Sequence, residues 1–149
     1  EWEIASGVPH IPFEALDENY VIDREAYLSY FRKMHHLFPK CKKMVMAVRN
    51  QIASSHHTLS GLLYDAVEDQ LYTTRIYDIE PIVDPMGVGD AFVAAYIHAH
   101  QKWGDKNQYC LDFSLSASAI KNTIPGDQNL VSEEEIISNM TSSGGRIQR

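Results

Sequence analysis

The residues best placed for chemistry lie in one short stretch with the sequence DPMGVGDAF. Gly87 and Gly89 follow an apolar run typical of a strand (79–83), and a helical run (91–103) begins directly after them. Backbone N–H groups in the first turn of a helix have no partner inside that helix, and the helix dipole favours negative charge there. Such a turn is suited to phosphate. Because the carboxylate of Asp90 is in the same place, the stretch predicts an anion site with a base beside it.

The alternative for this turn is structural: a tight strand-to-helix connection with Asp90 as a plain N-terminal cap. Carboxylates at both Asp84 and Asp90, together with the order strand, turn, helix, favour the anion site. The turn is not a dinucleotide fingerprint, because the third glycine is missing. It is not a Walker loop either, because no Gly-Lys-Ser/Thr follows it.

The composition is that of an ordinary globular protein. With 149 residues, 44% of them hydrophobic and 22% charged, the chain fits one domain with a real core. The net charge of −7 argues against nucleic acid or an anionic membrane as the main partner. No apolar run reaches the length of a membrane span, and no secretory leader is recognised. Cys41 and Cys110 are far apart without metal-ligand spacing, which predicts reduced thiols in a cytoplasmic protein.

Apolar periodicity and capping signals divide the chain into helices and strands. Helices are expected from an Asp23 cap to Pro39, at 91–103 ending at Gly104, at 105–123, and after a Ser132 cap. Strands are expected at 43–48, 58–64, 71–76 and 79–83, and loop at 1–20 and in the tail at 144–146. This order indicates an α/β layered fold. The helices outnumber the strands, so we expect the sheet to continue elsewhere.

Several other residues have both a functional and a structural interpretation. The histidines, including His56 and His57, show no ligand spacing, so a metal site is not expected. Arg49 follows a strand expected to be central, where a phosphate or nucleotide contact and a plain surface charge are equally open. Asn122 is expected to cap the C-terminus of a helix rather than to contact adenine.

Three stretches resemble the ribokinase (PfkB-type) carbohydrate kinases, and within them the 2-keto-3-deoxygluconate kinases. Residues 84–92 resemble the family's D-T-x-G-A-G-D-x-F signature. Residues 49–57 (RNQIASSHH) resemble T-L-R-x-S-x-S-A-S-H-N, and residues 121–131 (KNTIPGDQNLV) resemble L-K-H-T-I-x-G-D-x-N-x-V. Agreement at three separate stretches is far more specific than agreement at any one of them.

The resemblance implies the carboxy-terminal half of a ribokinase-like, Rossmann-type three-layer sandwich. Family members are considerably longer, so residues 1–149 would be a single partial domain without the amino-terminal half and the lid. The implied activity is transfer of the ATP γ-phosphoryl group to a sugar-acid hydroxyl, with 2-keto-3-deoxygluconate as the expected acceptor and ATP and Mg²⁺ as cofactors. Because such kinases often pair through the lid, a homodimer is expected for the intact protein.

The resemblance also assigns roles in the glycine turn. Asp90 would be the base that takes the proton from the sugar hydroxyl. The backbone N–H groups of Gly87, Val88 and Gly89 would form the anion hole for the transferring phosphoryl group. This fits phosphoryl transfer, which is mostly positioning and charge stabilisation.

Outside that turn, the resemblance implies nucleotide contacts at Arg49 and Asn122 and a monovalent cation at Asp84. The sequence departs from the family's pattern at two of these places. Pro85 replaces the usual threonine of the cation site, and Asn122 replaces a histidine. No Asn-x-x-Glu magnesium segment is recognised.

Two other classes of function remain open from the sequence. The chain could be a nucleotide- or phosphate-binding module without catalysis, because no complete sugar pocket is visible in it. It could also be an interaction domain in which the glycine turn is only structural. Nucleotide binding without an effect of sugar would indicate the module, and a folded protein that binds no nucleotide would indicate the interaction domain.

Overall fold

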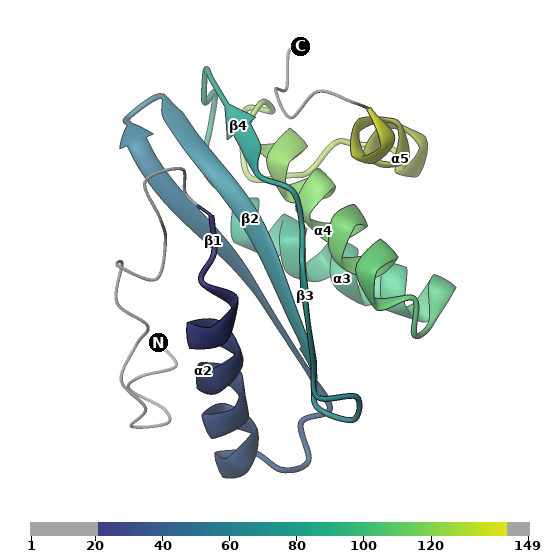
Figure 1. Ribbon diagram of the computed structural model, residues 1–149. Helices are drawn as coiled ribbons and strands as arrows, with labels where there is room; N and C mark the ends of the chain where they lie inside the picture. The colour runs from purple at the N-terminus through teal and green to yellow at the C-terminus, as the bar shows by residue number, and fades with distance from the viewer. Residues whose placement is uncertain (1–20, 143–149) are drawn as a thin grey trace. The chain divides into compact units, whose positions relative to one another are not determined.

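The computed structural model describes residues 21–142 (Figure 1). Predictions for residues 1–20 and for the tail at 144–146 lie outside the described residues. The elements are α2 (Arg24–Leu37), β1 (Lys43–Ala53), β2 (His56–Asp65), β3 (Gln70–Thr73), β4 (Tyr77–Ile79), α3 (Val88–Trp103), α4 (Asn107–Lys121) and α5 (Glu133–Thr141). The expected mixed α/β fold is therefore confirmed.

The strands form one four-stranded sheet. Its order is β1-β2-β3, and β4 pairs with β2 in antiparallel register from His57↔Ile79 to Leu59↔Tyr77. The described residues group into two compact units, one made of residues 21–45 with Leu63–Leu71, the other of Met46–Leu62 with residues 72–142. The description of the whole chain as one partial domain stays a prediction.

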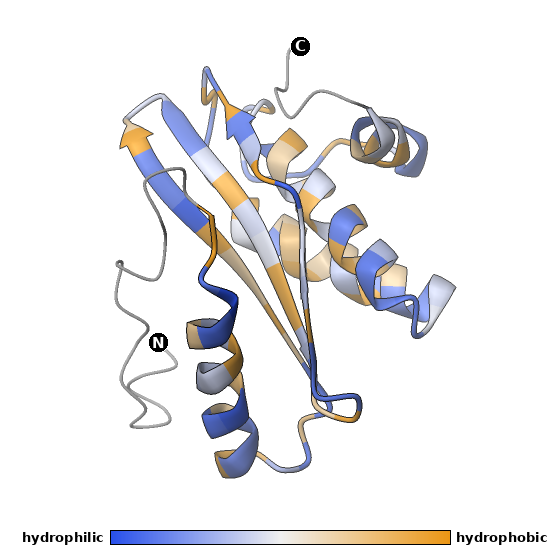
Figure 2. Ribbon diagram, in the orientation of Figure 1, coloured by the Kyte–Doolittle hydropathy of each residue, from blue (hydrophilic) through white to orange (hydrophobic). Residues whose placement is uncertain are grey.

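Helix α2 belongs to the first unit and forms as its sequence predicts. The Asp23 side chain caps it by accepting hydrogen bonds from the N–H groups of Glu25 and Ala26. The helix carries both hydrophilic and hydrophobic residues (Figure 2), and it buries Tyr27, Phe31 and Met34. Phe38 is 38% exposed, because the helix ends before it and Phe38 is the C-cap.

Helix α4 is the centre of the second unit. It contacts both α3 and α5 (Figure 1). Its small side chains are fully buried, which lets neighbouring helices approach closely: Ser114, Ser116, Ala117, Ser118 and Ala119. The Ser118 hydroxyl also donates a hydrogen bond to the Val88 carbonyl, which ties α4 to the start of α3.

Two strand predictions are wrong. The predicted strand at 79–83 is not formed, because β4 ends at Ile79 and a cis Glu80–Pro81 peptide follows. Proline has no N–H and cannot donate to a strand ladder. Strand β1 runs past Val48 to Ala53 as one arm of a hairpin, and it lies at the edge of the sheet formed by the described residues rather than at its centre. Its residues from Lys43 to Val48 are mostly half-buried, and most of those from Arg49 to Ala53 are exposed.

The remaining local predictions agree well with the structure. Gly104 is the C-cap of α3. Ser132 caps α5 in a capping box with Glu135. Cys41 and Cys110 are free thiols. In the part of the chain that is described, none of the helices is long and apolar enough to cross a bilayer.

Candidate functional site

The glycine turn forms the start of α3, and its two glycines have different surroundings. Gly87 is the N-cap, with a left-handed φ of 71°. A Cβ atom on Gly87 would lie 2.5 Å from the Asp127 carbonyl oxygen, so a side chain has no room there. A Cβ atom on Gly89 would meet nothing within 4 Å, so the space in front of the first turn is open. The turn therefore has the open backbone that an anion site needs.

Asp90 lies in the first turn of α3 and its side chain is exposed. It is not the N-terminal cap, because Gly87 takes that position without any side-chain cap. The alternative in which Asp90 is the N-terminal cap is therefore wrong. Counting only residues 21–142, the N–H groups of Val88, Gly89 and Asp90 donate to no acceptor. Unused donors and a free carboxylate thus share one helix end.

Hydrogen bonds bring together the three stretches that carry the family resemblance. The Ile82 N–H donates to the Ser55 carbonyl oxygen in the β1–β2 turn at 2.9 Å. The N–H groups of Val83 and Asp84 donate to the Asn122 carbonyl oxygen at 2.8 and 3.2 Å. The segment that leads into the glycine turn therefore joins the hairpin to the end of α4.

Both carboxylate oxygens of Asp84 accept backbone hydrogen bonds. Oδ1 accepts from the Met86 N–H at 2.9 Å, and Oδ2 accepts from the Gly126 N–H at 2.8 Å. These two bonds, with the charge of Lys121 as a smaller cause, hold the pKa of Asp84 below its ordinary value. A monovalent cation at Asp84 stays a prediction. No group of three or more His, Cys, Asp or Glu side chains that could hold a metal ion is found in the described part of the chain.

The end of α4 contributes two buried polar side chains. Lys121 is 0% exposed, and its ammonium group donates to the Ile124 carbonyl oxygen at 3.0 Å. Asn122 is 1% exposed, and its Nδ2 donates to the Ser118 carbonyl oxygen at 3.0 Å. Asn122 is the C-cap of α4, as its structural interpretation predicts, and its nucleotide contact stays a prediction. Sequence reasoning gave Lys121 no role, although it matches the lysine of the family's L-K-H-T pattern.

Arg49 lies within β1, not after it, and its side chain is exposed. Its charge is near His57: burial, then Arg49, lowers the pKa of His57. His57 is 4% exposed, and its Nδ1 has no partner within residues 21–142. The neighbouring His56 bonds through Nε2 to Asp78 Oδ1 at 2.5 Å. The hairpin thus carries one positively charged side chain, that of Arg49, and two imidazoles. The nucleotide contact expected at Arg49 stays a prediction.

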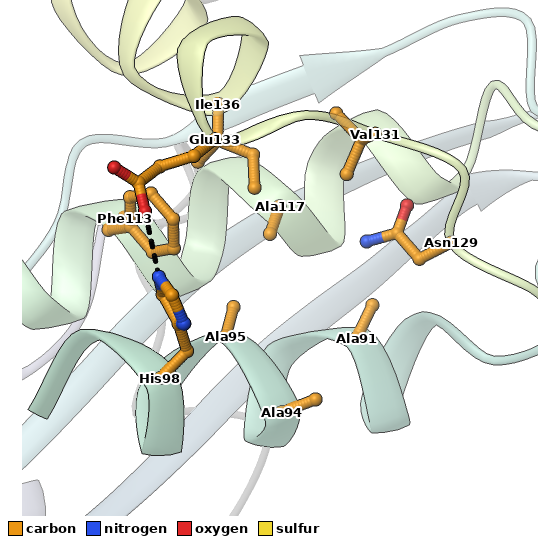
Figure 3. A pocket seen from close by; sticks show the side chains of 10 residues that line it. All are labelled: Ala91, Ala94, Ala95, His98, Phe113, Ala117, Asn129, Val131, Glu133 and Ile136. Atoms are coloured by element: carbon orange, nitrogen blue, oxygen red, sulfur yellow. Dashed lines mark hydrogen bonds and ion pairs between the residues drawn. The ribbon is translucent and has the colours of Figure 1, made fainter. Parts of the chain in front are cut away.

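A pocket of about 300 Å³ lies beside α3, and sequence reasoning missed it (Figure 3). Most of its walls are small or apolar side chains from α3, α4 and α5: Ala91, Ala94, Ala95, Phe113, Ala117 and Ile136. One end is bounded by the hydrogen bond from His98 Nε2 to Glu133 Oε2, and Asn129 also lines the pocket. The Oδ1 atom of Asn129 is buried and has no partner in the part of the chain that is described. The alanines at helical spacing along α3 are the one sequence signal for this pocket.

Comparison of the sequence with known proteins gives no match. No family model matches the chain, and no curated protein matches it significantly.

Solved structures do match. A 2-dehydro-3-deoxygluconokinase from Thermotoga maritima has 26% identity and a TM-score of 0.80, over 95% of this chain and 39% of that chain. A PfkB family carbohydrate kinase from Listeria grayi has 30% identity and a TM-score of 0.72, over 76% of this chain and 34% of that chain. A candidate 2-keto-3-deoxygluconate kinase from Enterococcus faecalis has 15% identity and a TM-score of 0.70, over 100% of this chain and 41% of that chain, which supports the fold only.

The chain therefore spans well under half the length of the proteins that it matches. Within that span the mixed helix and sheet fold matches that of the PfkB-type kinase structures, as the three sequence stretches predict. The chain resembles part of a PfkB-type carbohydrate kinase, and a 2-dehydro-3-deoxygluconokinase is among its structural neighbours.

Proposed function

We propose that the protein containing this chain is an ATP-dependent carbohydrate kinase that phosphorylates a sugar acid, with 2-keto-3-deoxygluconate as the expected acceptor. The observation that carries the proposal is the open first turn of α3, where unused backbone donors lie beside the Asp90 carboxylate. The fold likeness to the Thermotoga maritima enzyme supports it.

In this proposal the γ-phosphoryl group of ATP lies in front of the N–H groups of Gly87, Val88 and Gly89. These groups stabilise the negative charge on its oxygens as the phosphoryl group moves from ADP to the acceptor. Asp90 takes the proton that the sugar hydroxyl loses. A base in this position contributes roughly 10²–10⁴-fold to the rate.

Other roles follow from the family resemblance. Arg49 and Asn122 are proposed to lie near the nucleotide, and a cytoplasmic homodimer is the expected form of the intact protein. Mg²⁺ would neutralise charge on the nucleotide phosphates when bound. The described residues offer no cluster of side chains for a metal ion, so no ligand of Mg²⁺ is assigned among them.

The test is a kinase assay on the full-length protein with the Asp90→Asn variant. We expect kcat to fall by roughly 10²–10⁴-fold, because the base is lost, while the Kd for ATP measured by calorimetry changes little. Glu134→Gln is the matched control, since Glu134 is an exposed carboxylate in the first turn of α5. Normal turnover in Asp90→Asn would remove Asp90 from its role.

The same calorimetry separates a kinase from a binding module. A kinase should turn over only with a sugar acid present, and a sugar acid should alter its affinity for nucleotide. Binding of ATP with no effect of any sugar, and no turnover, would identify a nucleotide-binding module instead.

A further inference from the structure

Asp84 connects two loops that flank the first turn of α3. The first is the glycine loop, residues 84–87, and the second is the return loop, residues 124–127, which follows α4. Oδ1 of Asp84 accepts from the Met86 N–H inside the glycine loop. Oδ2 accepts from the Gly126 N–H in the return loop, 42 positions away in sequence. One side chain thus bonds to the backbone of both loops.

The beginnings of both loops are also hydrogen-bonded to the same end of α4. The Asn122 carbonyl oxygen accepts the N–H groups of Val83 and Asp84, which fixes the beginning of the glycine loop. The buried ammonium group of Lys121 donates to the Ile124 carbonyl oxygen, which fixes the beginning of the return loop. Because each loop is fixed at its first residue, the hydrogen bonds of the Asp84 carboxylate determine the distance between the remaining parts of the two loops.

That separation matters at Gly87. The return loop approaches so closely that a Cβ atom on Gly87 would lie 2.5 Å from the Asp127 carbonyl oxygen. Gly87 is the N-cap of α3, so its position and its φ of 71° decide where the following N–H groups point. A shift of the return loop would therefore reorient the donors proposed to hold phosphate.

We propose that Asp84 is a positioning residue, a clamp that holds the glycine loop and the return loop together so that the donors of the first turn of α3 point at one anion. The proposal rests on the proposed function and gives Asp84 a role other than that of a cation ligand. A carboxylate suits the clamp because it is acceptor-only when ionised, and hydrogen bonds to an ionised group are roughly twice as strong as neutral ones.

The clamp itself is tested without any ligand, by NMR of full-length protein labelled with ¹⁵N-glycine and ¹⁵N-methionine. If one carboxylate bonds both loops, the amide protons of Met86 and Gly126 shift together on acidification. The two amides then share one midpoint, because Oδ1 and Oδ2 belong to the same carboxylate. Gly104 is the control, since its N–H donates to the His100 carbonyl oxygen and not to a carboxylate.

The positioning role is tested with Asp84→Asn. The amide group of asparagine keeps one acceptor and turns a donor toward the second N–H, so one of the two bonds is lost. We expect the Kd for ATP to rise about 10-fold, in line with the loss of one hydrogen bond to a charged group. We expect the same loss in potassium and in tetramethylammonium buffers, with the KM for the sugar unchanged. Glu134→Gln again serves as the charge-matched control.

Each outcome decides a separate point. If Gly126 does not titrate with Met86, or if Asp84→Asn binds ATP as tightly as the wild type, the clamp is wrong. If Asp84→Asn weakens ATP binding in potassium buffer but not in tetramethylammonium buffer, Asp84 is a cation ligand and the proposal is overturned. If the wild type binds no ATP while both amides titrate together, the two loops are held as described and the proposed kinase function is what fails.

Discussion

At Gly87 the backbone conformation and a neighbouring loop both require a residue without a side chain. The left-handed φ of 71° favours glycine, and the Asp127 carbonyl oxygen leaves no space for a Cβ atom. Gly89, two residues later, is under neither constraint: its surroundings are empty and its φ is not left-handed. Of the two glycines in the motif, only Gly87 is therefore required by its backbone conformation and its surroundings.

This difference predicts opposite effects of alanine on stability. Gly87→Ala should lower the free energy of unfolding by at least about 1–2 kcal/mol, since a side chain in the left-handed region costs that much even without a clash. Gly89→Ala should raise it by up to about 1 kcal/mol, because alanine is the better helix former. Urea unfolding of the two variants measures both effects.

The Gly89→Ala variant also tests phosphate binding. If phosphate lies against the backbone of the first turn, Gly89→Ala should weaken ATP binding although the fold is more stable, because its Cβ atom fills the open space. A Gly89→Ala variant with unchanged affinity for ATP would show that the phosphate lies elsewhere.

At the scale of elements, helix α2 is joined to the turn between β2 and β3 by one carboxylate. Arg32 donates two hydrogen bonds to Asp69, from Nε at 2.9 Å and from an Nη atom at 2.6 Å. The Tyr64 hydroxyl donates to the same carboxylate at 2.8 Å. The bond from Arg32, then the one from Tyr64, lowers the pKa of Asp69 from 3.8 to about 2.

This shift predicts a pH dependence with a definite sign. Because the folded pKa is depressed, the Asp69 interaction stabilises the fold fully above the unfolded pKa of 3.8 and is lost as the pH falls toward about 2. Asp69→Asn should abolish that part of the acid sensitivity. Asparagine also tolerates the left-handed φ of 51° at this position.

The measurement is urea unfolding between pH 7 and pH 2. The difference in stability between wild type and Asp69→Asn should be constant above about pH 4 and shrink below it. A difference that stays constant down to pH 2 would show that Asp69 is not the group that titrates.

At the scale of the whole molecule, the chain spans only a fraction of the length of the carbohydrate kinases that it resembles. It covers 39% of the Thermotoga maritima protein and 34% of the Listeria grayi protein. The turn proposed to bind phosphate lies inside this part, and no complete sugar pocket is recognised in its sequence. The remaining length of such kinases is therefore where we expect most contacts to the sugar.

This division predicts how the 149-residue chain behaves by itself. We expect it to bind ATP without turning over a sugar acid, because Asp90 would face no bound acceptor. Calorimetry with ATP and a coupled assay with 2-keto-3-deoxygluconate measure the two properties on one sample. Turnover by the isolated chain, at a rate near that of the full-length protein, would place the sugar site within these residues.

Local physics explains which features could be predicted from the sequence. A helix cap depends on neighbours two or three positions away, so Asp23, Ser132 and Gly104 mark real helix ends. The glycine turn was predictable for the same reason, since its donors belong to consecutive residues. The predicted strand at 79–83 was wrong because an apolar run alone does not supply the ladder that a strand needs, and Pro81 interrupts it.

The contacts that shape the candidate site join residues far apart in the chain, and only the tertiary structure decided them. Periodicity and capping signals do not show that Asp84 accepts from Gly126, that Lys121 is buried, or that Asp127 faces Gly87. The sequence by itself determined an open helix start with a carboxylate in it. The packing of α4 against α3, and the hydrogen bonds at the end of α4, decided which donors remain free and which carboxylate holds the loops, because a hydrogen bond depends on distance in space and not in sequence.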